Sequence, residues 1–291
     1  MIQFTSLFRF RGEDGGIHYG EAGASLNHTR DSLTGRLVRI FQGGIPWDEG
    51  FKLSESRRKV VEVTSLFLHV KQPRSKLTLW NSKVLCPLPH TPIFICIGLN
   101  YKQHASEAGE QLCFIFRLRV DPLTLVLPEA ELCLVIGKDC KDFKADNDIS
   151  EYILGYTVGN DLSSRYWQNP ERCGGQHGSA KSFDKFAPIG PVITSTKTIP
   201  NLATLQLECF VNGDKRQSSK LDDLIFDAPA ILAHLTRGTT LRKGTVIMTG
   251  TPSGVAAFMK PPAWLQDGDV VEVRLDHVGS IKNKISLETA A

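Results

Sequence analysis

This sequence of 291 residues has a small net charge, no long apolar run and no closely spaced pair of cysteines. Its 34 basic and 31 acidic residues give a formal charge of only +3, and the scattered Lys and Arg disfavour a nucleic-acid-binding protein. No window approaches 18 uninterrupted apolar residues, so we expect no membrane-spanning helix. A hydrophobic content of 41% excludes a disordered chain. We therefore expect a globular protein that binds neither nucleic acid nor a membrane.

The seven cysteines lie mostly within apolar stretches and form no C-x-x-C pair. An odd number in that pattern indicates buried thiols in a reducing compartment rather than disulfides or a zinc site. The N-terminus has no long apolar stretch before Arg9, unlike a secretory signal. We predict a cytoplasmic location, with the mitochondrion as the alternative.

Short strand-like segments dominate the sequence and are not separated by regular helices. A Pro-rich stretch at 85–92 resembles a linker, so we expect a small N-terminal β subdomain over 1–88 and a larger domain over 89–291. This order predicts a mainly β (α+β) protein and disfavours a doubly wound parallel sheet. Strands are expected at 4–11, 17–19, 36–41, 93–97, 131–136, 153–158, 192–194, 205–211, 245–248 and 270–275, and helices at 101–108 and about 221–235.

Three carboxylates are candidates for a metal site. Glu129 and Glu131 lie two residues apart at the start of an apolar strand, so both project from the same face. Two like charges this close repel unless a cation lies between them. Asp161 ends a second strand and would complete an all-oxygen set suited to Mg²⁺. Taken singly, a bare E-x-E is more typical of a solvent-facing strand end, and Asp161 of a capping turn.

A second group of polar residues is typical of acid–base chemistry. His104 and Glu107 share a face of the predicted helix, where the carboxylate can orient the imidazole as a general base, although surface pairs also have this spacing. Lys181, unless it is simply solvated, would stabilise an enolate or oxyanion beside a metal. Thr251, in the glycine-punctuated segment 248–254, offers a hydroxyl and backbone N–H groups to an anion. That segment lacks G-x-x-x-x-G-K, which argues against a P-loop.

Taken in order, these segments strongly resemble the fumarylacetoacetate hydrolase family, specifically its small two-part members similar to acylpyruvases and oxaloacetate decarboxylases. The matching stretches are IGLNYKQHASE, PEAELCLVIGK, ILGYTVGNDLSSRYWQ, KSFDKFAPIGPV, IMTGTPSGV and DGDVVEV, which cover most of residues 93 to 285. The resemblance implies a β-sandwich roll with an N-terminal β subdomain, and a homodimer. It also implies Mg²⁺, with Mn²⁺ or Ca²⁺ as alternatives.

The resemblance implies roles for individual residues as well. Glu129, Glu131 and Asp161 would hold the metal; His104, Glu107 and Lys181 would be catalytic; and Gln168, Arg165 and Thr251 would bind the substrate. The expected reaction is hydrolytic or lyase cleavage of a C–C bond in a diketo or β-keto acid of the acylpyruvate type, with an enolate leaving group. The same groups would serve a decarboxylase or an isomerase of keto acids.

One segment departs from the family pattern. Residues 109–127 are shorter than the family's usual strand, Gly-Pro turn and second strand at this place. We expect Leu112–Phe116 to form a surrogate strand or an exposed apolar stretch. A weakly active homologue with a truncated segment is therefore a further alternative.

Overall fold

The structure is a computed structural model that describes residues 3–25, 27–63, 86–109 and 125–287. The expected strand at 112–116 lies outside the described residues, as does most of the shortened segment 109–127. The strands are β1 (Ser6–Gly12), β2 (Ile17–Glu21), β3 (Leu37–Gln42), β4 (Lys52–Glu62), β5 (Phe94–Cys96), β6 (Val126–Leu127), β7 (Ala130–Ile136), β8 (Ile153–Asn160), β9 (Ser163–Ser164), β10 (Ile189–Thr194), β11 (Gln206–Val211), β12 (Asp214–Lys220), β13 (Val246–Met248), β14 (Val270–Leu275) and β15 (Gly279–Lys284). The α-helices are α1 (Arg30–Leu33), α2 (Lys102–Gly109), α3 (Arg165–Gln168), α4 (Pro170–Cys173), α5 (Gly178–Lys181) and α6 (Ala228–Leu235).

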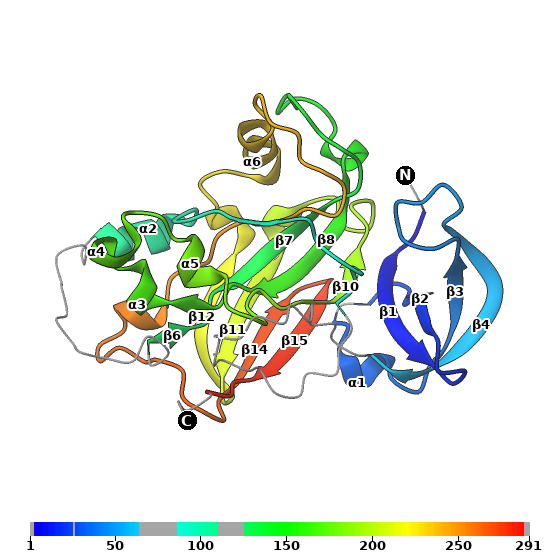
Figure 1. Ribbon diagram of the computed structural model, residues 1–291, viewed down its shortest axis with the longest axis horizontal. Helices are drawn as coiled ribbons and strands as arrows, with labels where there is room; N and C mark the ends of the chain where they lie inside the picture. The colour runs from blue at the N-terminus through cyan, green and yellow to red at the C-terminus, as the bar shows by residue number, and fades with distance from the viewer. Residues whose placement is uncertain (1–2, 26, 64–85, 110–124, 288–291) are drawn as a thin grey trace.

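The first four strands form a small antiparallel unit at one end of the molecule (Figure 1). Each strand pairs with the next, and β4 returns to β1, so the unit closes on itself. The hairpin expected between 4–11 and 17–19 is confirmed as β1–β2. The start of β1 also pairs with β10, through Ser6↔Thr194 and Leu7↔Ile193. The subdomain boundary at residue 88 stays a prediction.

The strands after β4 extend this sheet and add a second layer, which confirms the predicted mainly β class; β6 and β9 form a separate two-stranded sheet. A nine-stranded sheet has the order β2-β3-β4-β1-β10-β8-β7-β13-β5, and a four-stranded sheet has the order β12-β11-β14-β15. The smaller sheet packs on β7, β8 and β10. Apolar residues of both layers, including Leu132, Val158, Leu207 and Val273, form the core between them.

β7 and β8 are buried along their whole length. Their alternate side chains enter two separate apolar clusters: Leu132 and Leu134 face the four-stranded sheet, while Cys133 and Val135 join the cluster on the other face. Burial on both faces explains why the sequences of these strands do not alternate between apolar and polar residues. The ends of these two central strands carry the candidate carboxylates.

The predicted helix at 221–235 is wrong in its first half. Leu221–Asp223 is a 3₁₀ turn, an extended stretch follows, and α6 begins only at Ala228. Asp227 caps that start by accepting a hydrogen bond from the Ala230 backbone N–H at 2.9 Å. The helix at 101–108 is confirmed as α2. No helix in the described part of the chain is both long and apolar enough to span a bilayer.

Candidate metal and active site

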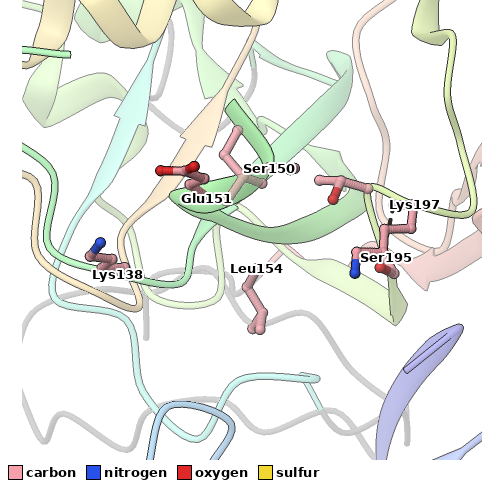
Figure 2. A pocket seen from close by; sticks show the side chains of 8 residues that line it. Lys138, Ser150, Glu151, Leu154, Ser195 and Lys197 are labelled. Carbon is pink, nitrogen blue, oxygen red and sulfur yellow. Dashed lines mark hydrogen bonds between the residues drawn. The ribbon is translucent and has the colours of Figure 1, made fainter. Parts of the chain in front are cut away.

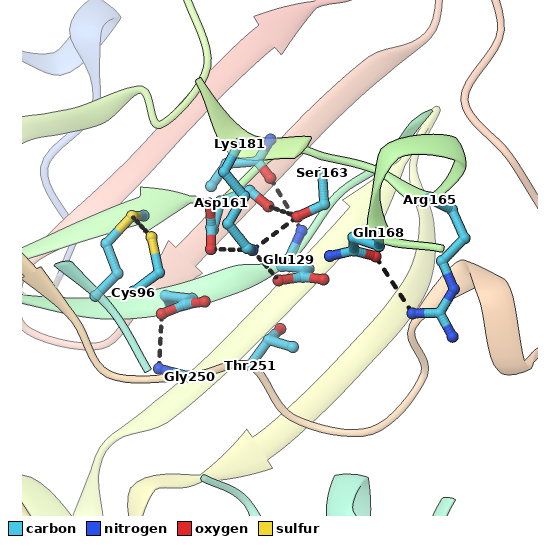
Figure 3. Close-up of polar contacts among 12 residues, drawn as sticks. Cys96, Glu129, Asp161, Ser163, Arg165, Gln168, Lys181, Gly250 and Thr251 are labelled. Atoms are coloured by element: carbon cyan, nitrogen blue, oxygen red, sulfur yellow. Dashed lines mark hydrogen bonds and ion pairs between the residues drawn. The ribbon is translucent and has the colours of Figure 1, made fainter. Parts of the chain in front are cut away.

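The pairing of β7 with β8 brings the three predicted carboxylates together. Ala130 pairs with Asn160, and the Asp161 backbone N–H donates to the Glu129 carbonyl at 2.8 Å. Glu129 therefore lies beside Asp161 at the end of the strand pair (Figure 3). Glu131 follows two residues later and pairs with Gly159 of β8. One carboxylate oxygen from each of the three residues lies within 4.8 Å of the others. The predicted juxtaposition is present, and we call these three residues the carboxylate cluster.

Burial makes the negative charge of this cluster unfavourable. Glu131 and Asp161 are each only 1% exposed. Burial, and next the charge of Asp161, raises the pKa of Glu131 well above its usual value. Burial likewise raises the pKa of Asp161 to about 6, although the nearby Lys181 opposes that shift. Among the residues that the structure describes, Asp161 Oδ1 is buried and has no hydrogen-bond partner. An all-oxygen donor set with an unpartnered buried oxygen fits a hard divalent cation.

Lys181 lies within the carboxylate cluster rather than merely beside it. From the end of α5, its Nζ donates to Glu129 Oε2 at 3.1 Å and to Ser163 Oγ at 2.8 Å, and closely contacts Asp161 Oδ2 (Figure 3). Burial lowers the pKa of Lys181, but Glu129, Asp161 and Glu131 outweigh it, so the net shift is upward. In the described part of the chain, Lys181 is the one cation ion-paired with the cluster, so negative charge remains in excess.

The segment after β13 holds Glu131 in place. The Gly250 N–H donates to Glu131 Oε2 at 2.6 Å. The sequence analysis assigns the N–H groups of this segment to a bound anion, but this one binds a carboxylate of the protein instead. Gly250 has φ +100°, and a Cβ there would lie 2.9 Å from that of Asn100. The buried Asn100 amide in turn donates to the Thr249 carbonyl at 2.8 Å. The sequence analysis missed this role of Asn100.

The predicted pair on α2 is formed. His104 Nδ1 lies 3.1 Å from Glu107 Oε2, and His104 is only 6% exposed. Glu107 Oε1 accepts from the Gly254 N–H at 3.2 Å. The ring of Phe258 meets the imidazole edge-on, with centroids 5.6 Å apart. Residues 249–254 therefore contact both the carboxylate cluster and the His104–Glu107 pair, which links the two in space.

The expected substrate-binding residues occupy two neighbouring places. Arg165 and Gln168 begin and end α3, and Arg165 Nη1 donates to Gln168 Oε1 at 3.2 Å. Burial lowers the pKa of Arg165, whose guanidinium lies 5.2 Å from the Phe258 ring centroid. Phe258 therefore lies between His104 and Arg165. Nothing in the sequence pattern pointed to it. Thr251 is buried and accepts a hydrogen bond from Gln217, a residue that the sequence analysis also missed.

Sulfur atoms line another side of the cluster. Cys96 on β5 and Met248 on β13 lie side by side, with sulfurs 4.0 Å apart (Figure 3). Burial, followed by the charges of Asp161 and Glu131, raises the pKa of Cys96 far above its usual value, so the thiol is protonated. The six cysteines in the described ranges are free thiols; Cys133, Cys140 and Cys209 are buried as predicted, whereas Cys86, Cys96 and Cys173 are only partly buried.

A separate pocket of about 340 Å³ lies at the other end of β7 and β8 (Figure 2). It is lined by Lys138, Ser150, Glu151, Ile153, Leu154, Ser195, Thr196 and Lys197. The seven residues of β7 separate it from the carboxylates by roughly 20 Å. None of the predicted site residues lines it.

The chain is similar to known proteins over most of its length. Residues 117–286 match the family described as "Fumarylacetoacetate (FAA) hydrolase C-terminal". A relative from Rattus norvegicus, "Oxaloacetate tautomerase Fahd2a, mitochondrial", is 35% identical over 288 residues, covering 93% of this chain and 86% of the relative. The Xenopus laevis "Oxaloacetate tautomerase fahd2, mitochondrial" is 37% identical over 221 residues, covering 70% of this chain and 69% of the relative.

Two solved structures are similar as well. Fumarylacetoacetate hydrolase from Exiguobacterium antarcticum superposes with a TM-score of 0.66 at 26% identity, covering 98% of this chain and 100% of that one. Maleylpyruvate hydrolase from Sphingobium sp. SYK-6, solved with manganese(II) and pyruvate, gives a TM-score of 0.55 at 28% identity, covering 70% of this chain and 73% of that one.

Proposed function

This chain belongs to the fumarylacetoacetate hydrolase family, and on that premise we propose that it is a divalent-metal-dependent enzyme of keto acids, with oxaloacetate keto–enol tautomerisation as its reaction. The observation that carries the proposal is the carboxylate cluster, in which one lysine faces three carboxylates and Asp161 Oδ1 has no partner within the described ranges. The names of the Rattus and Xenopus relatives support the choice of reaction.

Glu129, Glu131 and Asp161 would hold the cation. Their oxygens suit Mg²⁺, and also Mn²⁺ or Ca²⁺, and the manganese in the maleylpyruvate hydrolase structure supports an ion of this class. When bound, the ion would supply Lewis acidity toward the keto oxygen of the substrate.

The His104–Glu107 pair would move the proton. Glu107 holds His104 Nδ1, which leaves Nε2 for the substrate. His104 would take one proton from C3 of oxaloacetate, and the electron pair of that C–H bond would form the C2–C3 double bond of an enolate. The enolate oxygen then takes a proton back from the imidazolium, which gives the enol and restores His104. Lys181 stays charged because its pKa is raised, so it would stabilise the enolate electrostatically.

Hydrolytic C–C cleavage is the second candidate, and the same base supports it. His104 would deprotonate a water that attacks a carbonyl carbon of an acylpyruvate, and the C–C bond would break to release a carboxylic acid and an enolate. The similarity to the two hydrolase structures favours this reaction. The products distinguish the candidates, because tautomerisation leaves the carbon skeleton whole.

The test is an assay of the chain with Mg²⁺ or Mn²⁺ on both substrates. Loss of the oxaloacetate enol would be followed by ultraviolet absorption, and acylpyruvate cleavage by release of pyruvate. His104→Ala should lower turnover by about 10² to 10⁴ while Mg²⁺ still binds. His234→Ala, which removes an exposed imidazole on α6, is the matched control and should keep full turnover. Activity on neither substrate would contradict the proposed function, and full activity of His104→Ala would contradict the assigned base.

Assembly and location stay predictions within this proposal. We propose a homodimer, which light scattering of the purified protein would test against the monomer mass. The Rattus and Xenopus relatives are named as mitochondrial proteins, which supports the mitochondrial alternative over the cytoplasm. Fractionation of cells that express the chain would decide between the two compartments.

A further inference from the structure

Gln217 reaches the candidate site from the four-stranded sheet, although it lies far from every predicted site residue in the sequence. It belongs to β12 and is only 2% exposed. In the β11–β12 pairing, Cys209 faces Gln217 while Phe210 faces Lys215, so Arg216 is an extra residue at a bulge. Bulges change the direction of neighbouring side chains. Here the bulge adjoins the Thr251 segment, because a Cβ on Gly254 would lie 2.1 Å from the Arg216 carbonyl oxygen.

Each polar atom of the Gln217 amide has a partner in the site. Its Oε1 accepts from the Ala130 N–H at 3.0 Å. Its Nε2 donates to Thr251 Oγ1 at 2.8 Å and to the Pro252 carbonyl at 2.9 Å. A backbone N–H can only donate and a carbonyl can only accept, so these two contacts fix which end of the amide faces Thr251. The amide therefore presents a donor to Thr251.

The hydrogen bond from Gln217 limits the directions in which the Thr251 hydroxyl hydrogen can point. Because Thr251 Oγ1 accepts from Gln217, its own hydrogen must point elsewhere. Thr251 is 4% exposed, and within the described ranges no hydrogen bond donated by its hydroxyl is formed. A buried hydroxyl hydrogen without an acceptor is unfavourable unless a ligand accepts it. The same Gln217 amide holds Ala130, which lies between the carboxylates Glu129 and Glu131.

We propose that Gln217 is a positioning residue that makes the Thr251 hydroxyl a hydrogen-bond donor to a carboxylate of the bound keto acid. The proposal rests on the proposed function and adds a specific recognition of the substrate's anionic group. Gln217 also holds two segments of the site next to each other, because it hydrogen-bonds both to the segment that carries Glu129 and Glu131 and to the segment that carries Thr251. Gln217 acts through Thr251 and does not itself contact the substrate.

The test is a double-mutant cycle read by calorimetry, with oxalate as the probe anion on the Mg²⁺-loaded chain. Gln217→Glu keeps the length and the acceptor for the Ala130 N–H but, when ionised, cannot donate, so the Thr251 hydroxyl would turn toward it. Thr251→Val removes the hydroxyl. Each change should weaken oxalate binding by about tenfold or more, as expected for a lost hydrogen bond to a charged group. The double variant should bind no more weakly than either single variant, because only one interaction is lost.

Three controls make the outcome decisive. Mg²⁺ affinity should stay within about twofold in Gln217→Glu, and Thr251→Ser should restore oxalate binding. If Gln217→Glu does not fold, Gln217→Met enters the same cycle with the same expected non-additivity. Additive losses, or a parallel loss of Mg²⁺ affinity, would overturn the role of Gln217, because the effect would then come from charge or packing. Failure of the unchanged chain to bind oxalate with Mg²⁺ would instead contradict the proposed function.

Discussion

Two charge clusters in this molecule contain similar residues and behave in opposite ways. The carboxylate cluster has two buried acids, Glu131 and Asp161, and the partly buried Glu129 around Lys181. The second cluster lies on β14 and β15, where Glu272 accepts from Arg274 Nε at 2.8 Å and pairs with Lys282 Nζ at 3.1 Å. In this second cluster two cations form ion pairs with one acid, and the side chains of Arg274 and Lys282 are 44% and 62% exposed. We call Glu272, Arg274 and Lys282 the surface cluster.

The directions of the pKa shifts show the difference. Partial burial raises the pKa of Glu272, but the hydrogen bonds from Arg274 and Lys282 outweigh it, so its net shift is downward. The pKa values of Glu131 and Asp161 shift upward, chiefly through burial. Ionised Glu272 therefore stabilises the fold, whereas ionised Glu131 and Asp161 destabilise it until a cation arrives. Excess buried charge is thus a mark of a binding site, and balanced exposed charge a mark of ordinary surface.

Replacing the lysine of each cluster should give the largest difference in stability between the two clusters. Lys181→Met leaves the buried carboxylates without their cation, and we expect a loss of about 3–5 kcal/mol in the free energy of unfolding without metal. Mg²⁺ should offset much of this loss, because it supplies positive charge at the same place. Lys282→Met is the matched control and should cost at most about 1 kcal/mol, with no response to Mg²⁺. Urea unfolding with and without Mg²⁺ measures these free energies. Equal losses of stability in the two variants would contradict the difference between the clusters.

Adding metal to the unchanged chain is the next largest effect expected. A cation that binds only the folded state at 100 times its Kd stabilises by about 2.7 kcal/mol. Thermal unfolding in Mg²⁺ should therefore show a raised Tm relative to EDTA. Sodium chloride at matched ionic strength is the control, because screening alone affects both clusters. The same rise in Tm with either salt would contradict a specific metal site.

Removing one acid from each cluster sharpens the comparison further. Glu131→Gln deletes a proposed ligand charge and should weaken Mg²⁺ binding at least tenfold, about 1.4 kcal/mol. Glu272→Gln removes the same charge from the surface cluster and should leave Mg²⁺ affinity unchanged. Isothermal titration calorimetry measures both variants against the unchanged chain. An unaltered Mg²⁺ affinity in Glu131→Gln would rule out its role as a ligand.

The last comparison is a pH dependence of opposite sign in the two clusters, in which the contribution of Glu272 is the smallest effect expected. Without metal, Asp161 should lower the free energy of unfolding as pH rises from about 3.8 toward about 6, because its pKa is raised on folding. The pKa of Glu272 is lowered, so its contribution, about 0.2–1 kcal/mol, is present near neutral pH and is lost as pH falls through its folded value. Melting curves of Asp161→Asn and Glu272→Gln against pH would show this. If the two variants shifted the profile in the same direction, the contrast would fail.

Local sequence patterns predicted much of the fold and part of the candidate site. The sequence patterns at 131–136 and 153–158 predicted the strands β7 and β8, and a strand's two-residue period placed Glu129 and Glu131 on one face. The three-residue spacing of His104 and Glu107 predicted their contact on α2. Each of these relations spans only a few residues, so backbone geometry alone is enough to determine it.

Other features depend on segments that meet only in the folded chain. The helix predicted over 221–235 is shorter because Asn100 holds the Ile225 and Phe226 N–H groups in an extended stretch. Lys181 joins Glu129 across 52 residues, and Gln217 reaches Ala130 across 87. No local pattern encodes such pairs, because they arise when a helix or a second sheet packs against the strands that carry the carboxylates. The sequence by itself determined which residues lie on which strand face. Only the tertiary structure decided which carboxylate oxygen of the described residues lacks a partner and which hydroxyl hydrogen is left to donate, because burial and hydrogen-bond partners come from distant segments.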